Sequence, residues 1–85
     1  MCVTSPNYPS NYNNNEACSI RANFAAALEV TAFSTESGYD ELTIGSSTYG
    51  GISGPAGVIV DTNTPISWSS DGSDTRSGWR ICQGA

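Results

Sequence analysis

The chain has 85 residues, which is enough for one small domain, and 38% of them are hydrophobic. It contains no histidine and no lysine, which excludes Ser-His-Asp triads, Cys-His nucleophiles and catalytic or phosphate-binding lysines, so we expect no enzyme. Three arginines against eight carboxylates give a net charge of −5, which argues against a nucleic-acid partner.

The N-terminal part of the sequence predicts an irregular extended segment followed by a strand. The run Ser5-Pro6-Asn7-Tyr8-Pro9 cannot be helical, because each proline forces the preceding residue into extended geometry. Residues 1–20 are polar and rich in asparagine, so we expect no signal peptide in this chain. From Cys18 to Phe24 apolar and polar residues alternate, which predicts a half-buried strand over 18–24.

Further short strands are predicted at intervals of about 8–15 residues, separated by turns. The alternation places them at 28–33, 42–44, 58–60, 66–69 and 79–82, and the Gly/Ser-rich stretch 45–57 reads as a flexible loop. This pattern indicates an all-β sandwich or barrel with no long helix. No apolar run is long enough for a membrane span. The apolar faces of the strands predict a core of Val3, Ile20, Phe24, Leu28, Val30, Phe33, Leu42, Ile44, Val58, Ile66, Trp68, Trp79 and Ile81.

The three cysteines, Cys2, Cys18 and Cys82, form no CxxC motif and have no histidine to share a metal with. Three inert thiols in a reducing compartment are one interpretation. We favour one disulfide and one free thiol in an oxidising compartment, because a domain of this size needs a covalent restraint. Three pairings are then possible.

Motifs along almost the whole sequence resemble the CUB domain family. In chain order, these are Ser5-Pro6-Asn7-Tyr8-Pro9 with Tyr12 and Cys18, the F-x-x-E of 33–36, the Y-D-x-L-x-I of 39–44, the S-D-x-S of 70–73, and the Gly78-Trp79-Arg80-Ile81 strand. Together they cover about 3–83. Their order and approximate spacing make the resemblance specific, whereas the first motif alone is weak.

The resemblance implies an antiparallel-rich, jelly-roll-like β-sandwich of two sheets. Residues 1–85 would form a single CUB-like domain, one module of a larger extracellular or secreted protein. The family's first strand would be missing or reduced to Met1-Cys2. Cys18 matches a family cysteine whose partner lies upstream, so Cys2–Cys18 and Cys2–Cys82 rank equally. Cys18–Cys82 ranks third, because Cys18 is in phase with core-facing Ile20 whereas Cys82 is out of phase with Trp79 and Ile81.

The resemblance also implies a Ca²⁺ site, as in the calcium-binding members of the family. Calcium prefers hard oxygen ligands from carboxylates, carbonyls and water. Matched motif by motif, the metal ligands are Glu36, Asp40, Asp71 and the carbonyl of Ser73, with Tyr12 supporting them and Asp74 as a possible extra ligand. In this interpretation Glu36, Asp40, Asp71 and Tyr12 also contact a Lys or Arg of a protein partner.

A different interpretation needs no ligand. The acidic residues would be solvated loop charges, and the chain would be a purely structural or assembly module of a larger extracellular protein.

Overall fold

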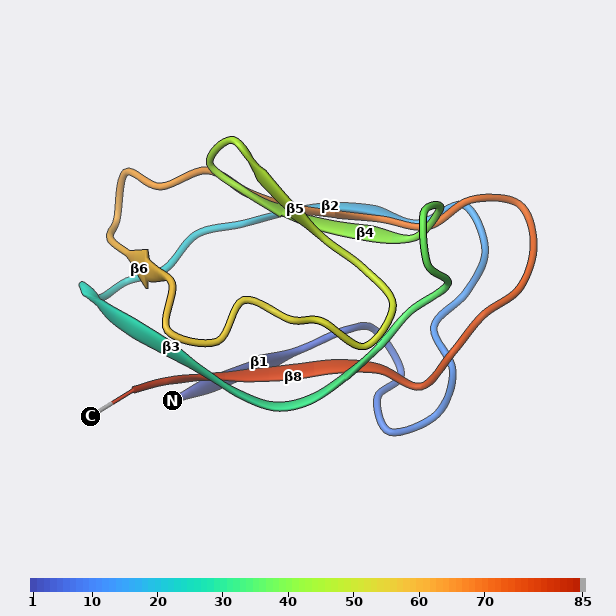
Figure 1. Cartoon of the computed structure of the whole chain (residues 1–85), viewed down its shortest axis with the longest axis horizontal. Helices are drawn as coiled ribbons and strands as arrows, with labels where there is room; N and C mark the ends of the chain where they lie inside the picture. Colours follow the sequence, from blue (N-terminus) through green and yellow to red (C-terminus); the bar gives the residue numbers. More distant parts are fainter. Residues whose placement is uncertain (85) are drawn as a thin grey trace.

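The computed structural model describes residues 1–84, which form two stacked four-stranded antiparallel sheets (Figure 1). One sheet has the order β1 (Cys2–Thr4), β8 (Gly78–Gln83), β3 (Ala26–Ser34), β6 (Ile59–Val60). The other has the order β2 (Ala17–Ile20), β7 (Ile66–Ser69), β4 (Glu41–Ile44), β5 (Ser47–Tyr49). The predicted all-β sandwich is therefore confirmed. None of residues 1–84 belongs to a helix that is long and apolar enough to cross a membrane.

The longest strand pairing, between β3 and β8, runs from Leu28 opposite Gln83 to Ser34 opposite Gly78. The register shifts between Val30 and Ala32, which marks a bulge. In the other sheet, β4 and β2 both pair with β7, so the segments before β4 and after β7 lie at one end of that sheet. This end of the molecule carries the site described below.

The core between the sheets consists mainly of the residues that the alternation predicts. Leu28, Leu42, Ile44, Trp68, Trp79 and Ile81 are buried, and Ile20, Phe24, Val30, Phe33, Val58 and Ile66 are partly buried against them. Trp68 stands edge-on between the rings of Tyr12 and Trp79, with centroid distances of 4.9 Å and 5.9 Å. The buried members Tyr12 and Val60 were not predicted.

Val3 was wrongly predicted as core, because 41% of it is exposed. It lies in β1, which pairs only with β8 and forms the edge of its sheet, so its side chain is covered on one side alone. Cys18 is also exposed although it is in phase with half-buried Ile20, because β2 is the edge strand of the other sheet.

Several predicted boundaries were wrong as well. The first strand, expected to be missing or reduced to Met1-Cys2, is the three-residue β1. The predicted strand over 18–24 ends at Ile20, and only Ile59–Val60 of 58–60 belongs to a strand. The expected loop 45–57 contains β5, which forms a hairpin with β4. Gly45 opens that two-residue turn with a φ of 59°.

Cys2 and Cys82 form the disulfide, and Cys18 is a free thiol. The two bonded residues lie opposite each other in the β1–β8 pairing, which holds the two ends of the chain together. Of the two pairings ranked equally from the sequence, the structure therefore has Cys2–Cys82.

Candidate metal site

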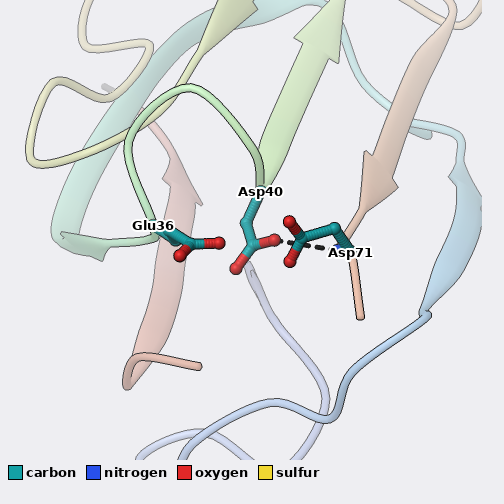
Figure 2. Close-up of side chains that lie close together, drawn as sticks. All are labelled: Glu36, Asp40 and Asp71. Atoms are coloured by element: carbon teal, nitrogen blue, oxygen red, sulfur yellow. Dashed lines mark hydrogen bonds between the residues drawn. The ribbon is translucent and has the colours of Figure 1, made fainter. Parts of the chain in front are cut away.

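Three carboxylates from three segments of the chain meet at one end of the sandwich (Figure 2). Glu36 follows β3, Asp40 precedes β4 and Asp71 follows β7. Each offers one oxygen atom, and these three oxygens all lie within 4.8 Å of one another. We call Glu36, Asp40 and Asp71 the acidic cluster.

The pairing of β4 with β7 brings two of these residues together. Glu41 of β4 lies opposite Ser69 of β7, so the residues just beyond each strand emerge at the same edge of the sheet. The backbone N–H of Asp71 then donates a hydrogen bond to Oδ1 of Asp40 at 2.9 Å, as Figure 2 shows.

The short segment between Glu36 and Asp40 folds into a tight turn that places both carboxylates on one side. The backbone N–H groups of Asp40 and Tyr39 both donate to the carbonyl of Glu36, at 3.0 and 3.3 Å. Thr35 fixes the base of the turn, because its hydroxyl donates to the carbonyl of Asp40 and accepts the N–H of Gly51, each at 2.9 Å. Thr35 is buried, and sequence reasoning missed this role.

Asp40 is completely buried and held from two directions. The Tyr12 hydroxyl donates to its Oδ2 at 2.5 Å, while its Oδ1 accepts the N–H of Asp71. The same Tyr12 hydroxyl accepts the backbone N–H of Glu36 at 3.2 Å. Tyr12 therefore links two members of the acidic cluster, which is the supporting position that the resemblance implies.

Burial and nearby negative charge raise the pKa values of two groups at the site, Glu36 and Tyr12. Burial raises the pKa of Glu36 to about 7, and a hydrogen bond with the Asp74 carboxyl and the charges of Asp71, Asp74 and Asp40 contribute. Burial and the hydrogen bond to Asp40 raise the pKa of Tyr12 above its usual range. Tyr12 thus stays protonated and remains a hydrogen-bond donor to Asp40.

The acidic cluster offers donor atoms of the kind that calcium binds. Oε1 of Glu36 is buried and accepts no hydrogen bond from the part of the chain that the structure describes. Buried carboxylate oxygens are normally paired or bound to a metal ion. Three hard, anionic oxygen donors are the ligands that Ca²⁺ prefers.

The two remaining predicted residues lie in the exposed segment after Asp71. The N–H of Ser73 donates to Oδ1 of Asp71 at 3.3 Å. Asp74 has a positive φ of 57° and is outside the acidic cluster, although it lies near enough to Glu36 to affect its pKa.

Comparison with known proteins found a similar sequence and a similar structure that bear on the fold. No family model matches the chain. It is 39% identical over 71 residues to embryonic protein UVS.2 of Xenopus laevis; the match covers 74% of this chain but only 14% of that protein. The structure is similar to that of the human MASP-1/3 CUB1-EGF-CUB2 region, with a TM-score of 0.74 and 21% identity. That similarity covers 95% of this chain and 37% of the other. The chain therefore has the fold of a CUB domain, which its sequence motifs predict.

Proposed function

We propose that the chain is a non-catalytic, extracellular protein-interaction module whose acidic cluster binds one Ca²⁺ ion. The observation that carries the proposal is the convergence of the three carboxylate oxygens within 4.8 Å around a buried Asp40. Burial is the main cause of the raised pKa of Glu36, and the neighbouring negative charges of Asp71, Asp74 and Asp40 raise it further. A divalent cation would remove the repulsion between these charges.

In this proposal Glu36, Asp40 and Asp71 provide the charged ligands, and the carbonyl of Ser73 and water complete the set. Bound calcium would supply positive charge and would hold the loops that carry these residues in one arrangement. Tyr12 orients the Asp40 carboxylate through its hydroxyl, as residues behind a metal ligand commonly do. Asp74 lies close enough to add an oxygen or a further negative charge.

The partner that this site favours presents a Lys or Arg side chain. Carboxylate oxygens that are not used by the ion can accept hydrogen bonds from an ammonium or guanidinium group, and such charge-assisted contacts are strong. The net charge of −5 adds a general attraction for basic surfaces. Residues 1–85 would form one domain of a larger extracellular protein, and the partner would be a separate protein.

Isothermal titration with CaCl₂ tests the metal site directly. We expect one site with a Kd of ~10⁻⁴–10⁻³ M, the range of extracellular modules. At ~1 mM calcium and a Kd of ~0.1 mM, binding adds about 1.4 kcal/mol to the free energy of unfolding. EDTA should therefore lower the melting temperature by several degrees.

Asp71→Asn should remove most of the calcium heat and most of the difference between the calcium and EDTA melts. It keeps the size of the side chain and leaves the oxygen that accepts the Ser73 N–H. Glu29→Gln is the matched control, because it removes the same charge from an exposed position on β3. If the control loses calcium binding equally, the effect is one of net charge and the proposed site is wrong.

A ligand-free structural module is the competing function. It is favoured by the hydrogen bonds from Tyr12 and Asp71, because each of them satisfies one carboxylate oxygen of Asp40. Coincident calcium and EDTA melts together with no heat of calcium binding would establish it over the proposed calcium site.

A further inference from the structure

The Asp71-Gly72 pair lies in the irregular segment between β7 and β8. Asp71 is half-buried and Gly72 is exposed, so water reaches the peptide bond that joins them. Asp71 is the one aspartate of the chain that a glycine follows. Because glycine has no Cβ, its backbone nitrogen is less hindered than that of any other residue. Gly72 thus leaves its nitrogen open to reaction with the carboxyl group of the preceding side chain.

The side chain of Asp71 is turned toward the backbone that follows it. Its Oδ1 accepts the N–H of Ser73 at 3.3 Å, so the carboxyl group lies beside the two peptide units after Asp71. The N–H of Gly72, which lies between these groups along the chain, donates no hydrogen bond to any residue in 1–84. No hydrogen bond therefore has to break at the Gly72 nitrogen before it can attack the Asp71 carboxyl carbon.

A hydrogen bond to the backbone carbonyl of Asp71 activates the same peptide unit. The N–H of Asn15 donates to this carbonyl oxygen at 2.8 Å. When the Gly72 nitrogen loses its proton, the negative charge spreads onto the carbonyl oxygen, and a donor at that oxygen stabilises the charge. The contact with Asn15 therefore makes the Gly72 nitrogen easier to deprotonate, and the deprotonated nitrogen is the nucleophile.

We infer that Asp71 is a modification site at which the chain isomerises spontaneously to isoaspartate. The Gly72 nitrogen attacks Cγ of Asp71, the nitrogen's proton and the carboxyl hydroxyl leave as water, and a five-membered succinimide forms. One water molecule then opens the ring. Addition at the former backbone carbonyl gives isoaspartate, in which the main chain runs through the side-chain carbonyl, and addition at the other carbonyl restores aspartate. The sequence of steps needs only water.

Isomerisation would remove Asp71 from the acidic cluster. Isoaspartate lengthens the main chain by one methylene and shortens the branch that carries the free carboxylate, whereas the Asp71 oxygen must lie within 4.8 Å of those of Glu36 and Asp40. Calcium held by Asp71 would in turn keep its carboxyl group from reacting. This protection rests on the proposed function, but isomerisation in the absence of calcium does not.

Asp61 is the internal control, because its Oδ1 also accepts the N–H of the residue two positions later, Asn63, at 2.8 Å. The residue directly after it is Thr62, whose branched Cβ hinders the nitrogen. The chain is kept in EDTA at physiological temperature, reduced, and digested with endoproteinase Asp-N, which cleaves before aspartate but not before isoaspartate.

Mass spectrometry then measures two uncut fragments. Fragment 61–73 reports isoaspartate at Asp71, and fragment 40–70 reports it at Asp61. We expect fragment 61–73 to accumulate several-fold faster. An Asp71 that stays intact, or equal accumulation of the two fragments, would overturn the inference.

Gly72→Ala is the matched variant, because an added Cβ would meet only Oδ1 of Asn15, at 3.7 Å, which is ordinary contact. It should melt like the unmodified chain and lose most of fragment 61–73; undiminished isoaspartate at Asp71 in this variant would also overturn the inference. CaCl₂ in place of EDTA should slow the reaction several-fold. An equal rate in both would contradict calcium binding by Asp71 and leave the isomerisation established, so the two proposals can fail separately.

Discussion

Asp40 shows how a carboxylate with no exposed surface is held in one orientation within the acidic cluster. Its Oδ2 accepts the Tyr12 hydroxyl and its Oδ1 accepts the N–H of Asp71. These two hydrogen bonds satisfy both carboxylate oxygens, as the burial of a polar side chain requires. The resemblance indicated Asp40 as a ligand through the Y-D motif and Tyr12 as its support. The hydrogen bond from the Asp71 N–H to Asp40 depends on loop geometry that no local pattern encodes.

Tyr12→Phe tests this support at the level of one oxygen atom. The variant removes the donor to Asp40 and the acceptor for the Glu36 N–H while it keeps the ring against Trp68. We expect a loss of about 2 kcal/mol in the free energy of unfolding, measured in urea, because a hydrogen bond to a charged group is lost. Tyr39→Phe is the control, since 65% of Tyr39 is exposed. An equal effect of both variants would contradict the role of Tyr12.

The raised pKa of Glu36 predicts opposite pH dependences with and without calcium. In EDTA, folding favours the protonated form, because the pKa of Glu36 is about 7 in the folded chain against 4.5 when unperturbed. That contribution to stability is fully present below the unperturbed pKa and is lost as the pH rises through about 7. Calcium requires the deprotonated form, so its stabilising effect should increase over the same range.

Melting curves at several pH values between about 5 and about 8 test this expectation. The gap between the calcium and EDTA melting temperatures should widen with pH in the unmodified chain. In Glu36→Gln, the part of the pH dependence that comes from this residue should disappear from the EDTA series. A gap that is constant with pH would show that protons and calcium do not compete at Glu36.

At the level of elements, two glycines allow the cost of an unfavourable backbone conformation to be compared with the cost of a steric clash. Gly45 and Gly78 both have positive φ, 59° and 86°, but an added Cβ would meet nothing within 4 Å at Gly45. At Gly78 it would lie 1.8 Å from Oγ of Ser5. This Ser5 oxygen accepts the backbone N–H of Trp79 where β8 begins.

Gly45→Ala should therefore cost about 1–2 kcal/mol, the penalty for a left-handed L-residue. Gly78→Ala should cost clearly more and is expected to prevent folding, because Ser5 and the start of β8 must move apart. Chemical denaturation followed by tryptophan fluorescence measures both. Similar losses in the free energy of unfolding for the two variants would mean that Ser5 can move away from the added Cβ at little cost.

The strands were predictable where periodicity is long and one face is buried, as in β3 and β7. The hairpin of β4 and β5 was missed although Gly45-Ser46 between alternating residues is a known two-residue turn signal, because the Gly/Ser content of 45–57 suggested a flexible loop. The exposure of Val3 could not be predicted from alternation. It depends on β1 being an edge strand, and strand order is a property of the whole fold.

At the level of the whole molecule, the Cys2–Cys82 disulfide joins residues 80 positions apart. On the chain-entropy model, closing a loop of this length restricts the unfolded chain by about 4–5 kcal/mol, although this explanation of disulfide stability is disputed. Cys2→Ser with Cys82→Ser should therefore lower the melting temperature strongly, or leave the chain unfolded. Cys18→Ser should melt like the unmodified chain, because that thiol is free and exposed. A similar melting temperature for all three proteins would show that strand pairing alone holds the ends.

The two described ends of the chain also meet through the hydrogen bond from the Gln83 N–H to the Met1 carbonyl at 2.8 Å. They lie at one pole of the sandwich, and the loops that carry the acidic cluster lie at the other (Figure 1). Any polypeptide joined to either end of this chain would therefore leave from the pole opposite the cluster. In a series of such domains, the linkers between them would therefore not cover the acidic cluster of any domain, and a partner protein could reach each cluster from solvent.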